Sequence, residues 1–206
     1  MSRAVHPIEA ESYRILRRLV DLSGLPPLSR AVAERVVHAT ADPAWAADLL
    51  LDEAALAAGR AALLAGAPLV TDVRMVAAGI TTRPALCALG LEGSGEPRRG
   101  APEQEGSGGA ATRVAAGIQA AVHRVGPGAV WVVGCAPTAL ARLLDLDAAP
   151  ALVVGLPVGF VGAVEAKRAL AASGLPALTN RSARGGAAVA AAAVNALLYH
   201  HQAAGR

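Results

Sequence analysis

The stretch from Ala129 to Val133 constrains the fold most, because Ala-Val-Trp-Val-Val is apolar at every position. A strand with one face in water alternates apolar and polar residues, whereas an uninterrupted apolar run is typical of a parallel strand covered on both faces. Similar short segments predict further strands, and helical patterns alternate with the last of them, at 137–144, 162–172 and 185–199. The order predicts a three-layer α/β/α fold with a mainly parallel, Rossmann-like sheet. The other predicted strands cover residues 69–73, 85–89, 151–154 and 177–179.

The first part of the chain has helical spacing instead, which predicts extra N-terminal helices at 8–21, 29–40 and 52–65. Ser29 is the residue that we expect to cap the second of these helices. Pro43 should stop it, because proline cannot continue a helix. Residues 92–110 are rich in Gly, Glu, Arg, Pro and Ser, and predict a flexible surface loop or insert within a single domain spanning 1–206.

Composition excludes several functions. Only 2% of residues are aromatic and the formal net charge is +3 without a continuous basic run, so nucleic-acid binding is not expected. No segment predicts a membrane span or a signal peptide, and the two cysteines, Cys87 and Cys135, supply neither a disulfide framework nor a zinc motif. We therefore expect a cytoplasmic protein with no metal site.

His38 is the first candidate for chemistry. It lies in the last turn of the predicted 29–40 helix, and Arg35 precedes it by three residues, so both side chains share a helix face. Histidine gains and loses a proton near neutral pH, and a helix C-terminus favours its charged form. The pair suits an acidic substrate that needs a proton or a hydrogen bond, although a lone helical histidine is more often a structural residue.

Three strand-to-helix connections are rich in Gly and Pro, namely 134–140, 155–163 and 180–187. All three should lie at the carboxyl edge of the sheet, where α/β folds bind ligands and where helix N-termini favour anions. Thr138 and Gly159 belong to the first two connections, Arg184 to the third, and Arg74 follows the 69–73 strand. Tight turns alone could also explain the glycines. No phosphate-binding glycine motif follows a strand, so a nucleotide is not required.

The chain resembles the precorrin-8X methylmutase family of cobalamin biosynthesis. The resemblance depends on segments spread along the chain, of which the runs at 71–80 and 157–163 are the most specific. The matching segments are Ile8 to Tyr13, Arg35 to Ala39, Thr71 to Ile80, Ala136 to Leu140, Gly155 to Ala163, Gly185-Gly186 and Val194 to Leu197.

The resemblance implies an isomerase that moves a methyl group from C11 to C12 of a tetrapyrrole precursor, converting precorrin-8X to hydrogenobyrinate, or the cobalt form to cobyrinate. It implies His38 as the proton donor and acceptor, and Ser12, Arg35 and Arg113 as substrate contacts. It also implies a homodimer that needs no cofactor. Cys135, Ala166 and Ala183 depart from the family pattern, where asparagine, serine and arginine are usual, and they affect individual pocket contacts.

Two other functions remain open from the sequence. A non-catalytic tetrapyrrole carrier would need the same pocket without the proton transfer. A nucleotide-binding α/β enzyme would fit the fold but lacks the phosphate fingerprint. The sequence does not decide whether the substrate contains cobalt.

Overall fold

The computed structural model describes residues 6–91 and 112–199. Within them a six-stranded sheet has the order β1-β6-β5-β4-β2-β3. Every neighbouring pair is parallel except β1 and β6, which are antiparallel. This confirms the mainly parallel sheet expected from the apolar runs. The strands are β1 (Leu49–Leu50), β2 (Leu69–Thr71), β3 (Leu86–Cys87), β4 (Val130–Val133), β5 (Leu152–Gly155) and β6 (Ala177–Asn180).

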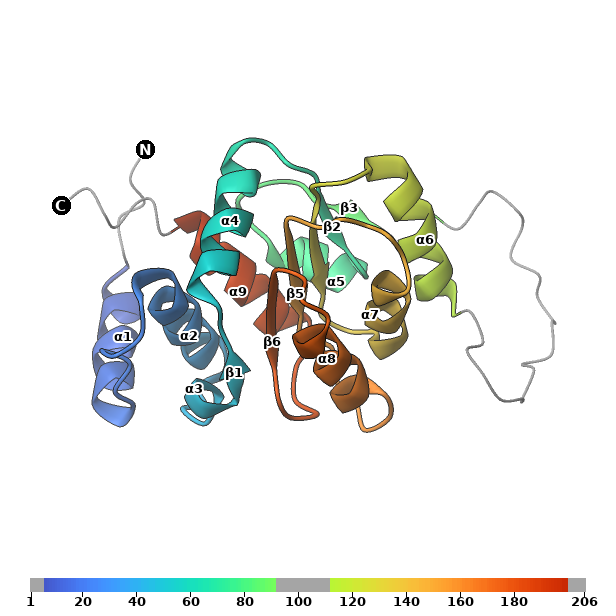
Figure 1. The fold of residues 1–206 in the computed structure, drawn as a ribbon. Helices are drawn as coiled ribbons and strands as arrows, with labels where there is room; N and C mark the ends of the chain where they lie inside the picture. The colour runs from blue at the N-terminus through green and yellow to red at the C-terminus, as the bar shows by residue number, and fades with distance from the viewer. Residues whose placement is uncertain (1–5, 92–111, 200–206) are drawn as a thin grey trace.

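Helices cover both faces of the sheet, which gives the three layers (Figure 1). On one face α4, α5 and α9 pack on the strands, with α1 and α2 beyond them, around one core cluster. On the other face α6, α7 and α8 enclose a second cluster. The helices are α1 (Pro7–Leu19), α2 (Pro27–Thr40), α3 (Trp45–Asp48), α4 (Glu53–Leu64), α5 (Arg74–Gly79), α6 (Arg113–Val125), α7 (Pro137–Leu144), α8 (Ala163–Ala172) and α9 (Ala187–Tyr199).

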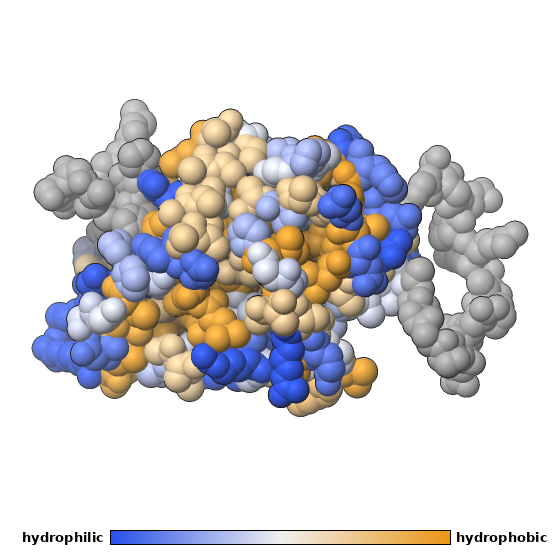
Figure 2. All heavy atoms as spheres, in the orientation of Figure 1, coloured by the Kyte–Doolittle hydropathy of each residue, from blue (hydrophilic) through white to orange (hydrophobic). Residues whose placement is uncertain are grey.

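Small side chains let the helices approach closely. Residues 189–197 of α9 are all buried and mostly alanine. A side chain on Gly79 of α5 would lie 2.6 Å from the Cβ of Ala191, so only glycine allows this contact. The surface over the alanine-rich α4 is mostly hydrophobic in Figure 2, whereas strongly hydrophilic residues gather over α1 and α6. The chain thus builds most of its core from small side chains at close approach, together with the buried rings of Trp45 and Trp131.

Two sequence expectations about the N-terminal helices had different outcomes. Ser29 does not cap α2, because that helix begins at Pro27 with Pro26 as its N-cap residue. Instead the Ser29 hydroxyl donates to Glu53 at 2.7 Å, which ties α2 to the first turn of α4. The helix ends at Thr40, before Pro43, because Ala41 takes the left-handed conformation with φ of 52°.

Other differences concern short elements. The sequence did not predict α3 or the antiparallel edge strand β1, and β3 is shorter than the expected 85–89 segment. The predicted loop at 92–110 lies outside the described residues. Within 6–91 and 112–199, no helix combines the length and the apolar character needed to cross a membrane.

Candidate active site

The candidate site lies where the carboxyl end of the sheet meets the C-terminus of α2. Helices α5, α7, α8 and α9 all begin after parallel strands, so their N-termini share this edge. Asp42, just beyond α2, forms an ion pair with Arg184 in the connection between β6 and α9. The Arg184 guanidinium also lies 4.5 Å from the ring centre of Trp45. These contacts bring the last turn of α2, which carries His38, to the edge where ligands bind in α/β folds.

Two residues of α1 hold the His38 imidazole from different sides. The Ser12 hydroxyl is hydrogen-bonded to His38 Nδ1 at 2.8 Å. The Tyr13 ring stacks on the imidazole with centroids 4.8 Å apart and planes 11° apart. Among residues 6–91 and 112–199 no group is hydrogen-bonded to Nε2. The half-buried ring is therefore fixed in orientation and presents one nitrogen for proton exchange.

Arg35 is held by the same helix. Its guanidinium donates to Glu9 Oε1 at 2.8 Å and to the Tyr13 hydroxyl at 3.3 Å. Burial lowers the pKa of Arg35, but Tyr13 and Glu9 raise it by more, so the side chain stays charged. The expectation that Arg35 and His38 share one face of α2 is confirmed, because both meet Tyr13. In this arrangement Glu9 already neutralises part of the Arg35 charge.

The first Gly/Pro connection does not offer its N–H groups to a ligand. Asp72, fully buried at the end of β2, accepts hydrogen bonds from the backbone N–H groups of Gly134, Cys135 and Ala136, and from that of Val73. The expected anion site at this connection is thus filled by a carboxylate of the chain itself. The expectation that the backbone N–H groups of this connection bind a substrate anion is therefore wrong, because Asp72 already accepts hydrogen bonds from them.

The second and third connections form one unit. Gly159 N–H donates to the Ala183 carbonyl at 3.1 Å, and Gly186 N–H donates to the Leu156 carbonyl at 2.9 Å. A side chain on Gly185 would lie 2.3 Å from the same Leu156 oxygen. Glycine is needed here because the two backbones touch. Gly159 and Arg184 are therefore neighbours within one continuous wall of the site.

The remaining predicted residues lie on the other side of this edge, over β2 to β4. The Thr138 hydroxyl is hydrogen-bonded to that of Thr112 at 2.9 Å, which joins the N-termini of α7 and α6. Arg113 is the first residue of α6, and Arg74 is the exposed first residue of α5. The structure thus groups Ser12 and Arg35 with His38 and pairs Arg184 with Asp42, just beyond the end of the same helix. Arg113 and Thr138 lie at the neighbouring starts of α6 and α7, and Arg74 lies apart from them at the start of α5.

Sequence reasoning missed several residues that shape the site. Tyr13 was not predicted as a site residue, yet it touches both Arg35 and His38. Lys167 is buried with 1% of its surface exposed, and helical spacing could have indicated this, because Ala163 and Leu170 on the same face are apolar. Asp72 could have been suspected as the polar residue directly after a buried strand.

Large apolar side chains are exposed in the connection between β5 and α8 and in α5. Phe160 is fully exposed, Val161 is 88% exposed, and Val158 and Met75 are 47% and 67% exposed. Exposed apolar side chains bordered by polar residues mark binding surfaces for ligands or partners. In the part of the chain that the structure describes, no group of three or more His, Cys, Asp or Glu residues could hold a metal ion.

A parallel α/β sheet whose strand ends carry arginines, with an oriented imidazole at their border, is typical of α/β enzymes that bind their ligands at the carboxyl edge of the sheet. Comparison with known proteins identifies the family of this chain. The family model described as precorrin-8X methylmutase matches residues 7–200. The chain belongs to the precorrin-8X methylmutase family.

Individual relatives agree over nearly the whole chain. It is 43% identical to the precorrin-8X methylmutase of Pseudomonas aeruginosa, covering 92% of this chain and 93% of the relative. It is 39% identical to the cobalt-precorrin-8 methylmutase of Salmonella typhimurium, covering 94% of each. The solved precorrin-8X methyl mutase of Thermus thermophilus superposes with a TM-score of 0.80 at 33% identity, covering 97% of this chain and 99% of that one.

Proposed function

We propose that this protein is the isomerase that moves the C11 methyl group of precorrin-8X to C12, giving hydrogenobyrinate. The observation that carries the proposal is the His38 ring, which Ser12 and Tyr13 hold in place while Nε2 has no partner in the described residues. Protonation or hydrogen bonding of a ring nitrogen redistributes electron density in the macrocycle and favours the migrated isomer. Positioned acid–base help of this kind typically contributes ~10²–10⁴-fold.

In this mechanism the hydroxyl of Ser12 fixes the imidazole through Nδ1, and His38 Nε2 gives the proton and takes it back. Tyr13 keeps the ring plane constant during the exchange. The substrate carries several carboxylates, and cationic side chains at both ends of the strand edge supply counter-charges for them. The residues that we assign to substrate binding are Ser12, Arg35, Arg74, Arg113, Thr138, Gly159 and Arg184.

Incubation of the purified protein with precorrin-8X tests the proposal, with the absorption spectrum followed for the corrin chromophore. Growth of that chromophore is the expected result, and an unchanged spectrum would contradict it. A parallel incubation with cobalt-precorrin-8 decides which form is the better substrate, since relatives carry both names. The cobalt ion would then be part of the substrate. We expect the reaction to take place in the cytoplasm.

The partner that we propose is a second copy of the chain. The fully exposed Phe160 and its neighbour Val161 supply an apolar surface beside the site, as a dimer interface requires. Light scattering after size exclusion should give twice the chain mass of 20.6 kDa, and Phe160→Ser should shift it toward one chain. Leu64→Ser, at an exposed leucine of α4, is the matched control and should leave the mass unchanged. A monomeric wild type would instead assign this surface to the macrocycle.

A further inference from the structure

Lys167 is a buried charge that the proposed mechanism does not use. It projects from the inner face of α8 and exposes 1% of its surface. Its ammonium donates to Asn180 Oδ1 at 2.9 Å, to the Arg184 carbonyl at 2.7 Å and to the Ser182 carbonyl. A lysine ammonium has three N–H donors and no acceptor, so each donor has one partner.

Two of these acceptors are backbone carbonyls of the connection between β6 and α9. Both point inward at the ammonium, from residues on either side of Ala183. Ala183 accepts the hydrogen bond from Gly159 that joins the two connections. The backbone from which the Arg184 side chain extends toward Asp42 is therefore anchored from within by Lys167.

Asn180 extends the anchor to α3. Its amide group accepts from Lys167 and donates to Asp48 Oδ2 at 2.8 Å. Asp48 also accepts from the Ser182 hydroxyl at 2.6 Å. The buried ammonium and the Asp48 carboxylate thus hold the same connection from its two sides.

We propose that Lys167 is a positioning residue for the anion-binding wall of the site, because its ammonium fixes the backbone that directs Arg184. The inference rests on the proposed function, since it concerns how the wall holds substrate carboxylates. Without the ammonium the inward carbonyls lose their donors and the connection must rearrange. His38 and Ser12 lie on other helices, so the proton transfer itself is not affected.

The charge of Lys167 also provides a distinctive readout. Burial lowers the pKa of Lys167 to about 8, and the Asp48 carboxylate opposes that shift. The charged group that acts on Lys167 is Asp48 on α3. Arg181 and Arg184, on the same connection, extend their guanidinium groups to the carbonyls of residues 47–49 and to Asp42. Ligand affinity should therefore weaken above about pH 8 as Lys167 loses its proton.

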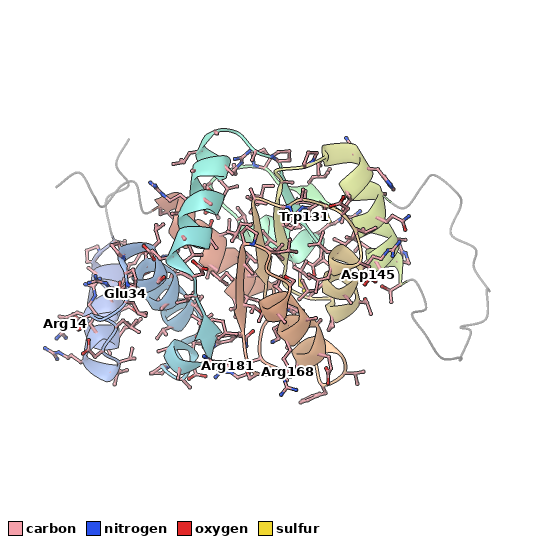
Figure 3. All side chains as sticks on the ribbon, viewed as in Figure 1. Arg14, Glu34, Trp131, Asp145, Arg168 and Arg181 are labelled. Carbon is pink, nitrogen blue, oxygen red and sulfur yellow. The ribbon has the colours of Figure 1, made fainter. Side chains whose placement is uncertain are left out.

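Lys167→Met keeps the length and removes the charge, and Arg168→Met is the matched control at the exposed neighbouring position, labelled in Figure 3. We expect Lys167→Met to weaken hydrogenobyrinate binding and raise KM for precorrin-8X about tenfold or more, while kcat changes less than about threefold. The wild type and Arg168→Met should lose affinity above about pH 8, and Lys167→Met should not. Equal affinity and an equal pH profile in Lys167→Met would overturn the proposal.

A measurement without ligand separates this inference from the proposed function. Hydrogen exchange of the amides at 181–186 should be faster in Lys167→Met than in Arg168→Met, while exchange in β4 stays the same. If Lys167→Met does not fold, the wild-type amides are compared at pH 7 and pH 9 after correction for intrinsic rates. Unchanged protection at 181–186 would overturn the positioning role, whereas a wild type that neither binds nor converts the tetrapyrrole would overturn the proposed function alone.

Discussion

Asp72→Asn is the substitution with the most direct consequence for the fold at the strand edge. Asp72 Oδ1 accepts from Val73 and Gly134 at 2.9 and 3.2 Å, and Oδ2 accepts from Cys135 and Ala136 at 2.7 and 3.0 Å. Asparagine has the same volume but replaces one of these oxygens by an NH2 group. Two backbone N–H groups then face a donor in a region without solvent.

The cost follows from those two contacts. A hydrogen bond to a charged group contributes about 1.5–3 kcal/mol, so losing two costs about 3–6 kcal/mol. A domain has a total unfolding free energy of about 5–15 kcal/mol, so the loss is a large fraction of it. For a chain of this size the melting temperature should fall by about 6–24 °C.

Urea denaturation followed by circular dichroism measures the effect. Asp147→Asn is the matched control, because Asp147 is exposed, and it should change the unfolding free energy by less than about 0.5 kcal/mol. If Asp72→Asn lowered the unfolding free energy by less than about 1 kcal/mol, the carboxylate would not be the anchor of this connection.

Three further predictions concern the site and the core. Ser12→Ala frees the His38 ring, so kcat should fall about tenfold, as expected for about 1.4 kcal/mol of lost orientation. Gly117→Ala puts a Cβ 2.3 Å from the Ala88 carbonyl oxygen, so the unfolding free energy should fall by about 1–3 kcal/mol or more in urea denaturation. Burial raises the pKa of Asp48, but four hydrogen bonds from the end of β6 and the turn after it lower it by more, so its pKa lies below 3.8. The stability from Asp48 is present above that pH and is lost as the pH falls through the folded pKa, so acid should destabilise the wild type more steeply than Asp48→Asn.

Each of these has a matched control. Ser23→Ala, at an exposed serine, should leave kcat unchanged, and equal losses in both serine variants would contradict the role of Ser12. Gly24→Ala meets no atom within 4 Å and should not destabilise the protein, and a similar cost at both glycines would contradict the close contact at Gly117. For Asp48, parallel acid-unfolding curves for the wild type and Asp48→Asn would show that its hydrogen bonds do not favour the charged form.

The central strands could be predicted from the sequence because burial on both faces leaves a continuous apolar signal, as in Val130–Val133. The edge strand Leu49–Leu50 could not, since two residues carry no periodicity and their pairing with Asn180 and Thr179 is distant in the chain. Ser29 was assigned as a cap from local preference, but its partner Glu53 comes from another helix.

The candidate site, too, could be predicted from the sequence only where local patterns determine it. Helical spacing placed Arg35 and His38 on one face, and the structure agrees. Local glycine patterns indicated three anion sites but could not show that Asp72, which follows a different strand, already fills the first of them. The hold of Glu9 and Tyr13 on Arg35 likewise depends on how α1 packs against α2, which no local pattern determines.

The His38→Ala variant tests the central claim most directly, in a comparison with the wild type and with His123→Ala at an exposed histidine of α6. Conversion of precorrin-8X is followed by the corrin absorption under single-turnover conditions, and binding of hydrogenobyrinate is measured in parallel. We predict that His38→Ala loses ~10²–10⁴-fold in rate while the dissociation constant changes only a few-fold. Conversion by His38→Ala at the wild-type rate would contradict the account.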